Sequence, residues 1–368
     1  MRAKLSFILF ILIFVFSSDG IWGLEVHYGG KLVEVVAADS GYTDSTIATK
    51  FEDGWYSKGP TQFDVDKDGN IYILDRFDCQ VQKYDNTGKW VFSFSIPGKR
   101  TKKNPSGKCS PYMLGDITVD NWGNIYVDNF KFSPQGKLLF KCGGGQVLLT
   151  DRTGRLYSFQ DQFSLVNIYG LEGRRDGRID RLEKDLHLFD YYWDLGIVQN
   201  EVGDDIYFRE NKYLVRTSFE EYSKDAKVDS TGRVIRGKID TVAVLPDIIR
   251  VKEFYDNLKD PVWEENPFTF IGFDRNSNFY FVMSEFHYGP KRLMRACRIY
   301  RLRRYHLEDG ELTKTGEVEV AFAKGTEECS DKELFEVSRA FKVSGDGTIY
   351  WLHGTVDKVK VSKIIFDE

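Results

Sequence analysis

Short apolar segments alternate with acidic turns along most of the chain. In six places an apolar segment leads into a turn containing Asp with Gly or Asn, and a second segment then opens with an apolar residue and a Tyr. The six copies cover residues 63–75, 117–129, 147–160, 201–210, 272–283 and 341–353. Two apolar strands joined by such a turn are the strongest short-range signal of a β-hairpin. The pattern therefore predicts six β-hairpins.

Further apolar segments follow these hairpins and complete a repeat of four strands. Third strands are predicted at residues 81–84, 163–169, 212–219, 298–305 and 359–366, and fourth strands at residues 90–96, 138–141, 239–245 and 317–322. Four antiparallel strands per repeat make up a propeller blade. We therefore predict an all-β fold, a six-bladed β-propeller with four-stranded antiparallel blades.

One repeat is specific enough to name a family. The segment PTQFDVDKDGNIYILDRFDCQVQKYDNTGKW, residues 60–90, resembles a repeat of the NHL family, whose blades carry a Pro, an apolar strand, an Asp-x-x-Gly-Asn turn, Ile-Tyr-Val and then Asp. The resemblance is clear again at residues 117–129 and is limited to the hairpin pattern in the other four copies. It implies a single six-bladed disc around a central channel, and its motifs specify architecture, not activity.

The two ends of the chain are expected to complete one blade together. Residues 359–366 form the last apolar segment, and residues 31–36 form a free strand of matching character near the N-terminus. We predict that these two strands share the sixth blade, because their pairing removes two exposed sheet edges.

The first 23 residues have the pattern of an export signal. Arg2 and Lys4 precede an uncharged run over residues 5–16, and small and turn-forming residues follow at 17–20. This order of charged, apolar and small residues is typical of a signal peptide. We predict cleavage near residues 20–23, a single propeller domain over residues 24–368, and a secreted or periplasmic location. The alternative is an uncleaved N-terminal anchor, and no later apolar run reaches the length of a membrane span.

The charge balance argues against nucleic-acid binding. The 368 residues include 51 Lys and Arg and 56 Asp and Glu, giving a formal net charge of −5, whereas neutralising phosphates requires a cationic surface. We expect a monomer whose partners are not nucleic acids. Residues 99–108, with Arg174, Arg175 and Arg178, nevertheless form basic connections. These are either solvated loop charges or a rim that docks on an anionic polymer or envelope surface.

Five cysteines in an exported chain predict two disulfides and one remaining thiol. Their positions in the predicted blades favour a bridge between Cys297 and Cys329. They also favour a bridge from Cys109 to either Cys142 or Cys79.

An acidic segment of the first hairpin has two interpretations. Asp64, Asp66 and Asp68, followed by Gly69, match the start of a D-x-D-x-D-G calcium loop. The same residues form the repeated hairpin turn, in which the carboxylates would accept hydrogen bonds from backbone N–H groups.

A ring of polar residues is expected where the second strands end. Three positions after the aligned tyrosines stand Asp75, Asn129, Gln160, Glu210, Met283 and His353. The five polar members either hydrogen-bond neighbouring loops or form a ligand pocket over the channel mouth. Oxygen donors from several blades could also hold Ca²⁺, as in lactonase-type six-bladed enzymes.

Two classes of function follow from these features. The first is an exported, non-enzymatic propeller that binds a protein, peptide or glycan on its loop-rich face and needs no cofactor. It is favoured because no G-x-S-x-G elbow, P-loop or local zinc motif occurs in the sequence. The alternative is a calcium-dependent, lactonase-like hydrolase or lyase, in which Glu210 or Asp75 is a metal ligand or base.

Overall fold

The computed structural model describes residues 24–43, 45–52, 56–60, 62–98, 116–142, 147–150, 154–160, 165–180, 198–199, 205–210, 213–218, 240–244, 263–265, 269–288, 295–322, 341–354 and 357–367. All secondary-structure elements in these residues are β-strands. This part of the chain holds no helix that is long and apolar enough to cross a membrane. The predicted signal peptide lies outside the described residues.

The strands form antiparallel sheets in chain order. Sheet 1 contains β5 (Gln62–Val65), β6 (Ile71–Asp75), β7 (Gln80–Tyr84) and β8 (Trp90–Ser95). Sheet 2 contains β9 (Ile117–Val119), β10 (Ile125–Val127), β11 (Phe130–Phe132) and β12 (Leu138–Lys141). Sheet 3 contains β13 (Val147–Thr150), β14 (Leu156–Gln160), β15 (Leu165–Tyr169) and β16 (Arg175–Asp180). Sheet 4 contains β17 (Val198–Gln199), β18 (Asp205–Glu210), β19 (Tyr213–Ser218) and β20 (Asp240–Val244).

The last two sheets each include a strand from the N-terminal end of the described chain. Sheet 5 contains β21 (Trp263–Glu265), β22 (Thr269–Phe273), β23 (Asn278–Tyr288), β24 (Arg295–Glu308), β25 (Glu311–Phe322) and β1 (Leu24–Tyr28). Sheet 6 contains β26 (Phe341–Val343), β27 (Ile349–Gly354), β28 (Lys358–Phe366) and β2 (Gly30–Asp39). A separate hairpin joins β3 (Lys50–Glu52) to β4 (Tyr56–Lys58).

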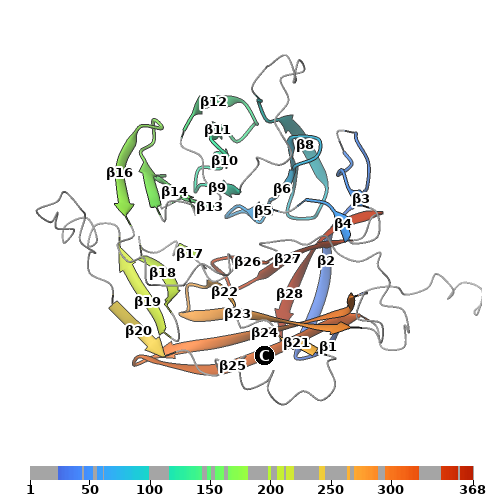
Figure 1. The fold of residues 1–368 in the computed structure, drawn as a ribbon, viewed down its shortest axis with the longest axis vertical. Coiled ribbons are helices and arrows are strands. Elements are labelled where there is room, and N and C mark those ends of the chain that lie inside the picture. The colour runs from blue at the N-terminus through green and yellow to red at the C-terminus, as the bar shows by residue number, and fades with distance from the viewer. Residues whose placement is uncertain are drawn as a thin grey trace, which may run out of the picture.

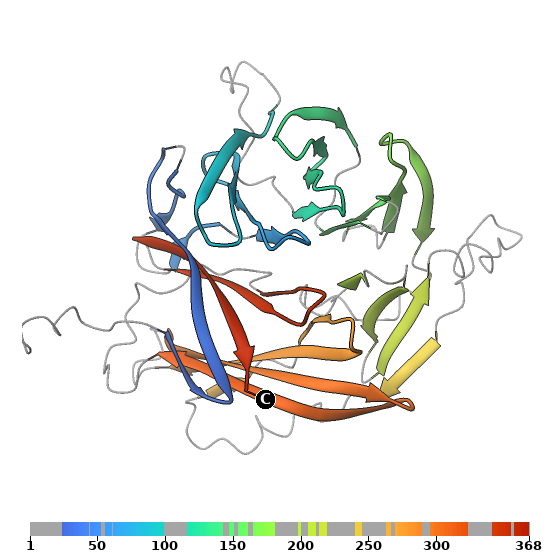
Figure 2. The same ribbon diagram turned by 180° about the vertical axis from the view of Figure 1, so that it is seen from behind.

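The sheets are arranged around a common centre, as in a β-propeller (Figures 1 and 2). The innermost strands are β5, β9, β13, β17, β22 and β26, and each contacts the next in this order. Lys342 of β26 then lies with its Nζ 3.5 Å from Oδ1 of Asp64 on β5. The predicted all-β architecture of four-stranded antiparallel sheets is therefore present in sheets 1 to 4 and 6, whereas sheet 5 has six strands.

The two terminal segments pair as the sequence predicts. β2 runs antiparallel to β28, from Gly30 opposite Phe366 to Asp39 opposite Lys358. β1 adds a pairing that the sequence did not indicate, because it lies along the edge of β25 in sheet 5.

Apolar clusters fill the space between neighbouring sheets. Val36 of β2 and Val359 of β28 pack with Phe63 and Ile71 of sheet 1. Sheets 1 and 2 share Leu74, Val81, Ile125 and Phe132, and sheets 5 and 6 share Leu302, Val318, Trp351 and Ile364. Because each of these three clusters draws side chains from two sheets, sheets 1, 2, 5 and 6 bury apolar faces against their neighbours.

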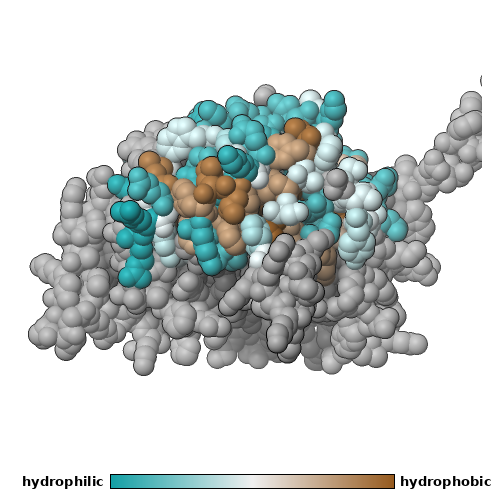
Figure 3. Space-filling view, turned by 90° about the horizontal axis from the view of Figure 1, so that it is seen from above, coloured by the Kyte–Doolittle hydropathy of each residue, from teal (hydrophilic) through white to brown (hydrophobic). Residues whose placement is uncertain are grey.

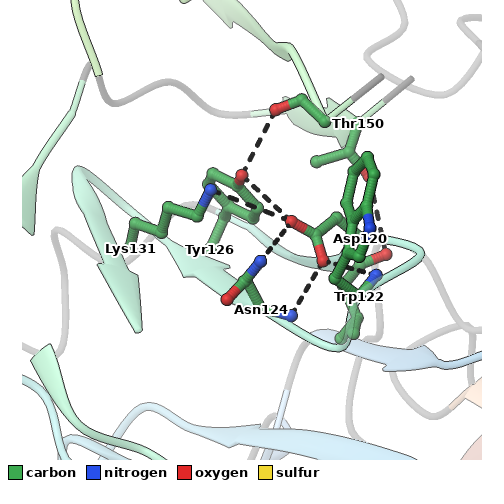
Figure 4. Close-up of polar contacts among 8 residues, drawn as sticks. Asp120, Trp122, Asn124, Tyr126, Lys131 and Thr150 are labelled. Atoms are coloured by element: carbon green, nitrogen blue, oxygen red, sulfur yellow. Dashed lines mark hydrogen bonds and ion pairs between the residues drawn. The ribbon is translucent and has the colours of Figure 1, made fainter. Parts of the chain in front are cut away.

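The turn between the first and second strands has the same hydrogen bonds in three sheets. In sheet 2, Oδ1 of Asp120 accepts the backbone N–H groups of Trp122 and Asn124. Its Oδ2 accepts the side-chain amide of Asn124 at 2.8 Å and the hydroxyl of Tyr126 at 3.2 Å (Figure 4). The same four bonds recur around Asp66 in sheet 1 and around Asp274 in sheet 5.

We expect removal of the turn carboxylate to be costly because it leaves buried groups without partners. Asp120 is 3% exposed, and Nζ of the buried Lys131 lies 3.9 Å from its Oδ2. Asp120→Ala is expected to lower the free energy of unfolding by about 3 kcal/mol, and Tyr126→Phe by about 1 kcal/mol. Urea unfolding measures both losses.

The matched control is Asp85→Ala in the exposed β7–β8 turn. Asp85 accepts the N–H groups of Thr87 and Lys89 and the hydroxyl of Thr87, and these partners all lie within its own exposed turn. Asp85→Ala should therefore lower the free energy of unfolding clearly less than Asp120→Ala does. Equal losses at Asp85 and Asp120 would show that the buried contacts of Asp120 contribute nothing.

Candidate functional site

The predicted polar ring falls at one end of the second strands. Asp75 ends β6, Gln160 ends β14 and Glu210 ends β18. Asn129 follows β10 by two residues, and His353 is the penultimate residue of β27. We call this end of the sheets the loop face, and the opposite end, where the Asp-containing hairpin turns lie, the turn face. The side chains of Gln160 and Glu210 lie outside the described residues.

Asp75 holds the loop face of sheet 1 together. Its side chain is fully buried and accepts hydrogen bonds from the backbone N–H groups of Ala48, Phe77 and Asp78 at 2.9, 3.1 and 3.1 Å. Burial raises the pKa of Asp75 to about 6. Its contacts are those of a residue that fixes the preceding loop and the β6–β7 turn, which is the first of the two sequence interpretations.

His353 packs inside sheet 6. Its Nε2 lies 2.8 Å from Oγ of Ser362, and its ring stacks on Trp351 with the ring centres 4.4 Å apart. Burial, with a smaller contribution from the positive charge of Lys360, lowers the pKa of His353 to about 3. His353 is thus neutral, and its ring and its Nε2 both contact protein groups.

Asn129 differs from Asp75 and His353. Its Oδ1 is buried and has no hydrogen-bond partner among the described residues. An acceptor of this kind is costly to leave unpaired, so it is a position where a bound water or ligand group would be stabilised.

The acidic segment of the first hairpin forms a turn. Oδ2 of Asp64 accepts the N–H of Val119 in sheet 2 at 2.8 Å, whereas Asp66 uses its carboxylate within the turn and Asp68 is exposed. Burial raises the pKa of Asp64, and the nearby Lys342 opposes this shift. Within the described ranges no three acidic, His or Cys side chains come together as a metal site. These contacts are the ones that the turn interpretation expects, and the calcium loop stays a prediction.

The cysteines differ from one of the predicted alternatives. Cys142 is a free thiol, 9% exposed, in a cluster with Tyr126 and Leu156, so the Cys109–Cys142 bridge is absent. Burial raises the pKa of Cys142 to about 11, which makes it unreactive. Cys79 is disulfide-bonded. Cys109, Cys329 and the side chain of Cys297 lie outside the described residues, so the bridge from Cys297 to Cys329 stays a prediction.

A polar cavity lies at the turn face, where the sequence had indicated only turns. It has a volume of about 530 Å³ and is lined by the inner turns of sheets 1, 5 and 6. Its charged lining residues are Asp66, Lys67, Asp68, Asp274, Arg275, Asp346 and Lys363. Asp66 and Asp274 are engaged within their own turns, while Lys67, Asp68 and Arg275 are exposed.

Two further lining residues are held in place by contacts within sheet 6. Oδ1 of Asp346 accepts the N–H of Thr348 and the hydroxyl of Ser344, and these hydrogen bonds keep its pKa below the ordinary value although burial opposes them. Nζ of Lys363 lies 5.3 Å from the ring centre of Tyr350. Sequence reasoning missed the cavity because the charged residues after the turn aspartates do not repeat: Lys67 and Asp68 follow Asp66, but only Arg275 is charged after Asp274.

Comparisons with known proteins give only distant structural similarity. No family model matches the chain, and no curated protein matches it in sequence. A streptogramin B lyase is 12% identical, with 92% of this chain and 98% of that chain covered and a TM-score of 0.46. A virginiamycin B lyase from Staphylococcus aureus is 10% identical, with 84% and 96% covered and a TM-score of 0.44. A member of the DUF4221 family from Bacteroides vulgatus is 9% identical, with 94% and 99% covered and a TM-score of 0.48.

All three TM-scores are below 0.5 and all three identities are 12% or lower. These similarities therefore say nothing about what this protein binds or does. The likeness to NHL repeats stays a resemblance of the hairpin sequence.

Proposed function

We propose that this protein is an exported, closed six-bladed propeller that binds a polar ligand, a peptide or a glycan, without catalysing a reaction on it. The observation that carries the proposal is the cavity at the turn face. Its exposed cations and acceptors alternate over three turns, which suits a ligand carrying both hydrogen-bond donors and acceptors. The predicted pocket on the loop-rich face would belong to the same function, but its long connections lie outside the described residues.

The proposed closure of the ring would supply the rigid frame that such a site needs. β2 and β28 bring the two ends of the chain into sheet 6, and Lys342 reaches Asp64 in sheet 1. A sixth blade completed in this way would fix the turns of sheets 1, 5 and 6 relative to one another. A site built from three turns would then be pre-organised for binding.

Export and a monomeric state belong to the same proposal. The order of charged, apolar and small residues in positions 1–23 supports a signal peptide and a secreted or periplasmic location. A monomer is expected because the proposed cavity is completed by turns of a single chain.

The binding proposal is tested with a panel of soluble peptides and oligosaccharides, read as a shift in melting temperature. A ligand at 100 times its dissociation constant adds about 2.7 kcal/mol of stability. For any compound that gives a shift, Lys67→Ala with Asp68→Ala should weaken binding by about tenfold without changing the melting temperature of the free protein. These side chains are exposed, so their removal leaves the core intact.

The matched control is Gln135→Ala with Lys137→Ala, two exposed residues of the β11–β12 turn, none of whose described residues lines the cavity. It should bind as the unaltered protein does. A compound whose affinity falls equally in both double variants, or in neither, would place the site elsewhere.

Calcium separates the enzymatic alternative from this proposal. In the described part of the chain, Asp64, Asp75 and His353 are each engaged with protein partners. We therefore expect EDTA followed by added calcium to leave the melting temperature unchanged. A rise with calcium that Glu210→Ala removes, together with lactone hydrolysis, would favour the lactonase-like alternative.

A further inference from the structure

Exposed apolar side chains gather where sheets 2 and 3 meet at the turn face. Trp122 in the β9–β10 turn is 56% exposed, and Leu171 in the β15–β16 turn is 55% exposed. Leu138 and Leu139 at the start of β12 are 43% and 45% exposed. We call these four residues the apolar edge. Figure 3, which looks onto the rim of the disc, shows hydrophobic residues grouped together with hydrophilic residues around them.

The residues of the apolar edge come from separate turns that are packed against one another. A Cβ added at Gly154 would lie 2.7 Å from both Leu171 Cδ2 and Trp122 Cζ3, so these two side chains meet over Gly154. A Cβ added at Gly173 would lie 2.6 Å from Cε2 of Phe140, so the β15–β16 turn rests on β12. Trp122 and Leu171 thus form one apolar surface, and the turn that carries Leu171 rests on the strand that carries Leu138 and Leu139. The exposure of this surface is unusual, because tight turns are normally polar.

Basic side chains surround the apolar edge. Lys137 and Lys141 flank Leu138 and Leu139, and Arg174 and Arg175 follow Leu171, all four of them exposed. Glu172 is the acidic exposed residue in the same turn. This local excess of positive charge occurs in a chain with a formal net charge of −5, so the partner of this surface is expected to be anionic.

We propose that the apolar edge docks on an anionic phospholipid membrane surface. Trp and Leu side chains at turn tips would enter the boundary between headgroups and acyl chains, while the four cations contact lipid phosphates. A membrane fits better than an acidic peptide because exposed Trp and Leu side chains at turn tips and on the outermost strand of sheet 2 suit insertion into a lipid surface. The polar cavity described above, which could enclose a peptide, lies at sheets 1, 5 and 6.

Vesicle sedimentation tests the proposal with the purified exported protein, and mass spectrometry establishes whether residues 1–23 are retained. We expect binding to vesicles of phosphatidylcholine and phosphatidylglycerol in a 3:1 ratio and little binding to phosphatidylcholine alone. Trp122→Ser with Leu171→Ser should lower the partition coefficient about tenfold or more. Lys137→Glu with Arg174→Glu should weaken binding similarly, and so should 0.5 M salt, because both remove the attraction to anionic lipid.

Two control variants distinguish binding through the apolar edge from non-specific hydrophobic binding and from an effect of net charge. Tyr42→Ser with Val244→Ser removes comparably exposed apolar side chains in other parts of the fold, and Lys31→Glu with Lys89→Glu makes the same change in charge elsewhere. Both should bind as the unaltered protein in the same processed form. If a serine pair lowers the melting temperature, Trp122→Ser alone replaces it. The proposal would be overturned if both edge variants bound vesicles as well as the unaltered protein does, or if the unaltered protein did not bind anionic vesicles. Binding of an acidic protein in place of vesicles would assign the surface to a protein partner.

Discussion

Removing β1 and β2, residues 24–39, is expected to abolish the cooperative unfolding transition instead of lowering its midpoint. β2 covers β28 along its whole length, and β1 covers the edge of β25, so the deletion exposes the outer edges of two sheets. It also removes Val36 and Ala38, which are buried in the cluster between sheets 6 and 1. Circular dichroism melting should show a broad, non-cooperative loss of signal. A sharp transition at the original temperature would show that the ring does not depend on its terminal strands.

A substitution at one glycine tests the same contact between sheets 1 and 6 without deleting a strand. Gly88, in the β7–β8 turn of sheet 1, has a φ of 85°, and a Cβ there would lie 1.6 Å from the carbonyl oxygen of Val35 on β2. Gly88→Ala must therefore push the turn of sheet 1 away from sheet 6. We expect a loss of about 3–5 kcal/mol in the free energy of unfolding, from the positive φ and the backbone collision together.

Gly123→Ala is the matched control for this substitution. Gly123 has a φ of 79°, but its added Cβ would meet only Pro134 at 3.5 Å, which is ordinary contact. It should lose about 1–2 kcal/mol from the positive φ alone. The difference between the two alanine variants measures the contact between sheets 1 and 6. Equal losses of unfolding free energy in Gly88→Ala and Gly123→Ala would mean that sheets 1 and 6 move apart at this contact without measurable cost.

The sequence predicted the strands wherever the signal was local. The Asp-Gly and Gly-Asn turns at Asp66 and Asp120 lie between apolar strands, and both hairpins form where they were expected. β16 was missed because its sequence, RDGRID over Arg175–Asp180, is mostly charged and has no alternation of apolar residues. β1 was missed because its pairing with β25 depends on a partner almost 300 positions away in the chain.

The candidate site was harder to predict because position in a strand does not fix what a side chain contacts. Asp75 and His353 occupy the expected strand ends, yet one binds backbone N–H groups and the other stacks on Trp351. Cys142 looked available for a bridge, and its burial with Tyr126 and Leu156 is set by the meeting of sheets 2 and 3. The cavity at the turn face is formed by three turns from distant parts of the sequence, so no local motif predicts it.

Acid is expected to destabilise the fold through His353. The pKa of His353 falls from an ordinary value of 6.5 to about 3 in the folded protein, chiefly because the ring is buried and secondly because of Lys360. Between these two values the unfolded chain binds a proton that the folded protein does not, so stability decreases as the pH falls through this window. The full loss is about 5 kcal/mol, from 1.36 kcal/mol per pH unit.

Asp75 acts in the opposite direction over part of the same range. Burial raises its pKa from 3.8 to about 6, so the folded protein binds a proton more readily than the unfolded chain. Stability from this group increases by up to about 3 kcal/mol as the pH falls from 6 to 4. The acid loss due to His353 is therefore partly masked in the unaltered protein, and single substitutions are needed to separate the two groups.

His353→Gln should remove the pH dependence of its group while costing packing against Trp351 and the contact with Ser362. At pH 7 we expect it to be about 2–3 kcal/mol less stable than the unaltered protein. The gap should close near pH 5 and reverse below it, because only the unaltered protein must keep a histidine unprotonated. Asp75→Asn should show the opposite trend, with a deficit that widens as the pH falls from 6 to 4. Urea unfolding at several pH values measures the free energy of unfolding for both variants. If the stability deficit of His353→Gln stayed constant from pH 7 to pH 4, His353 would not be a buried neutral histidine.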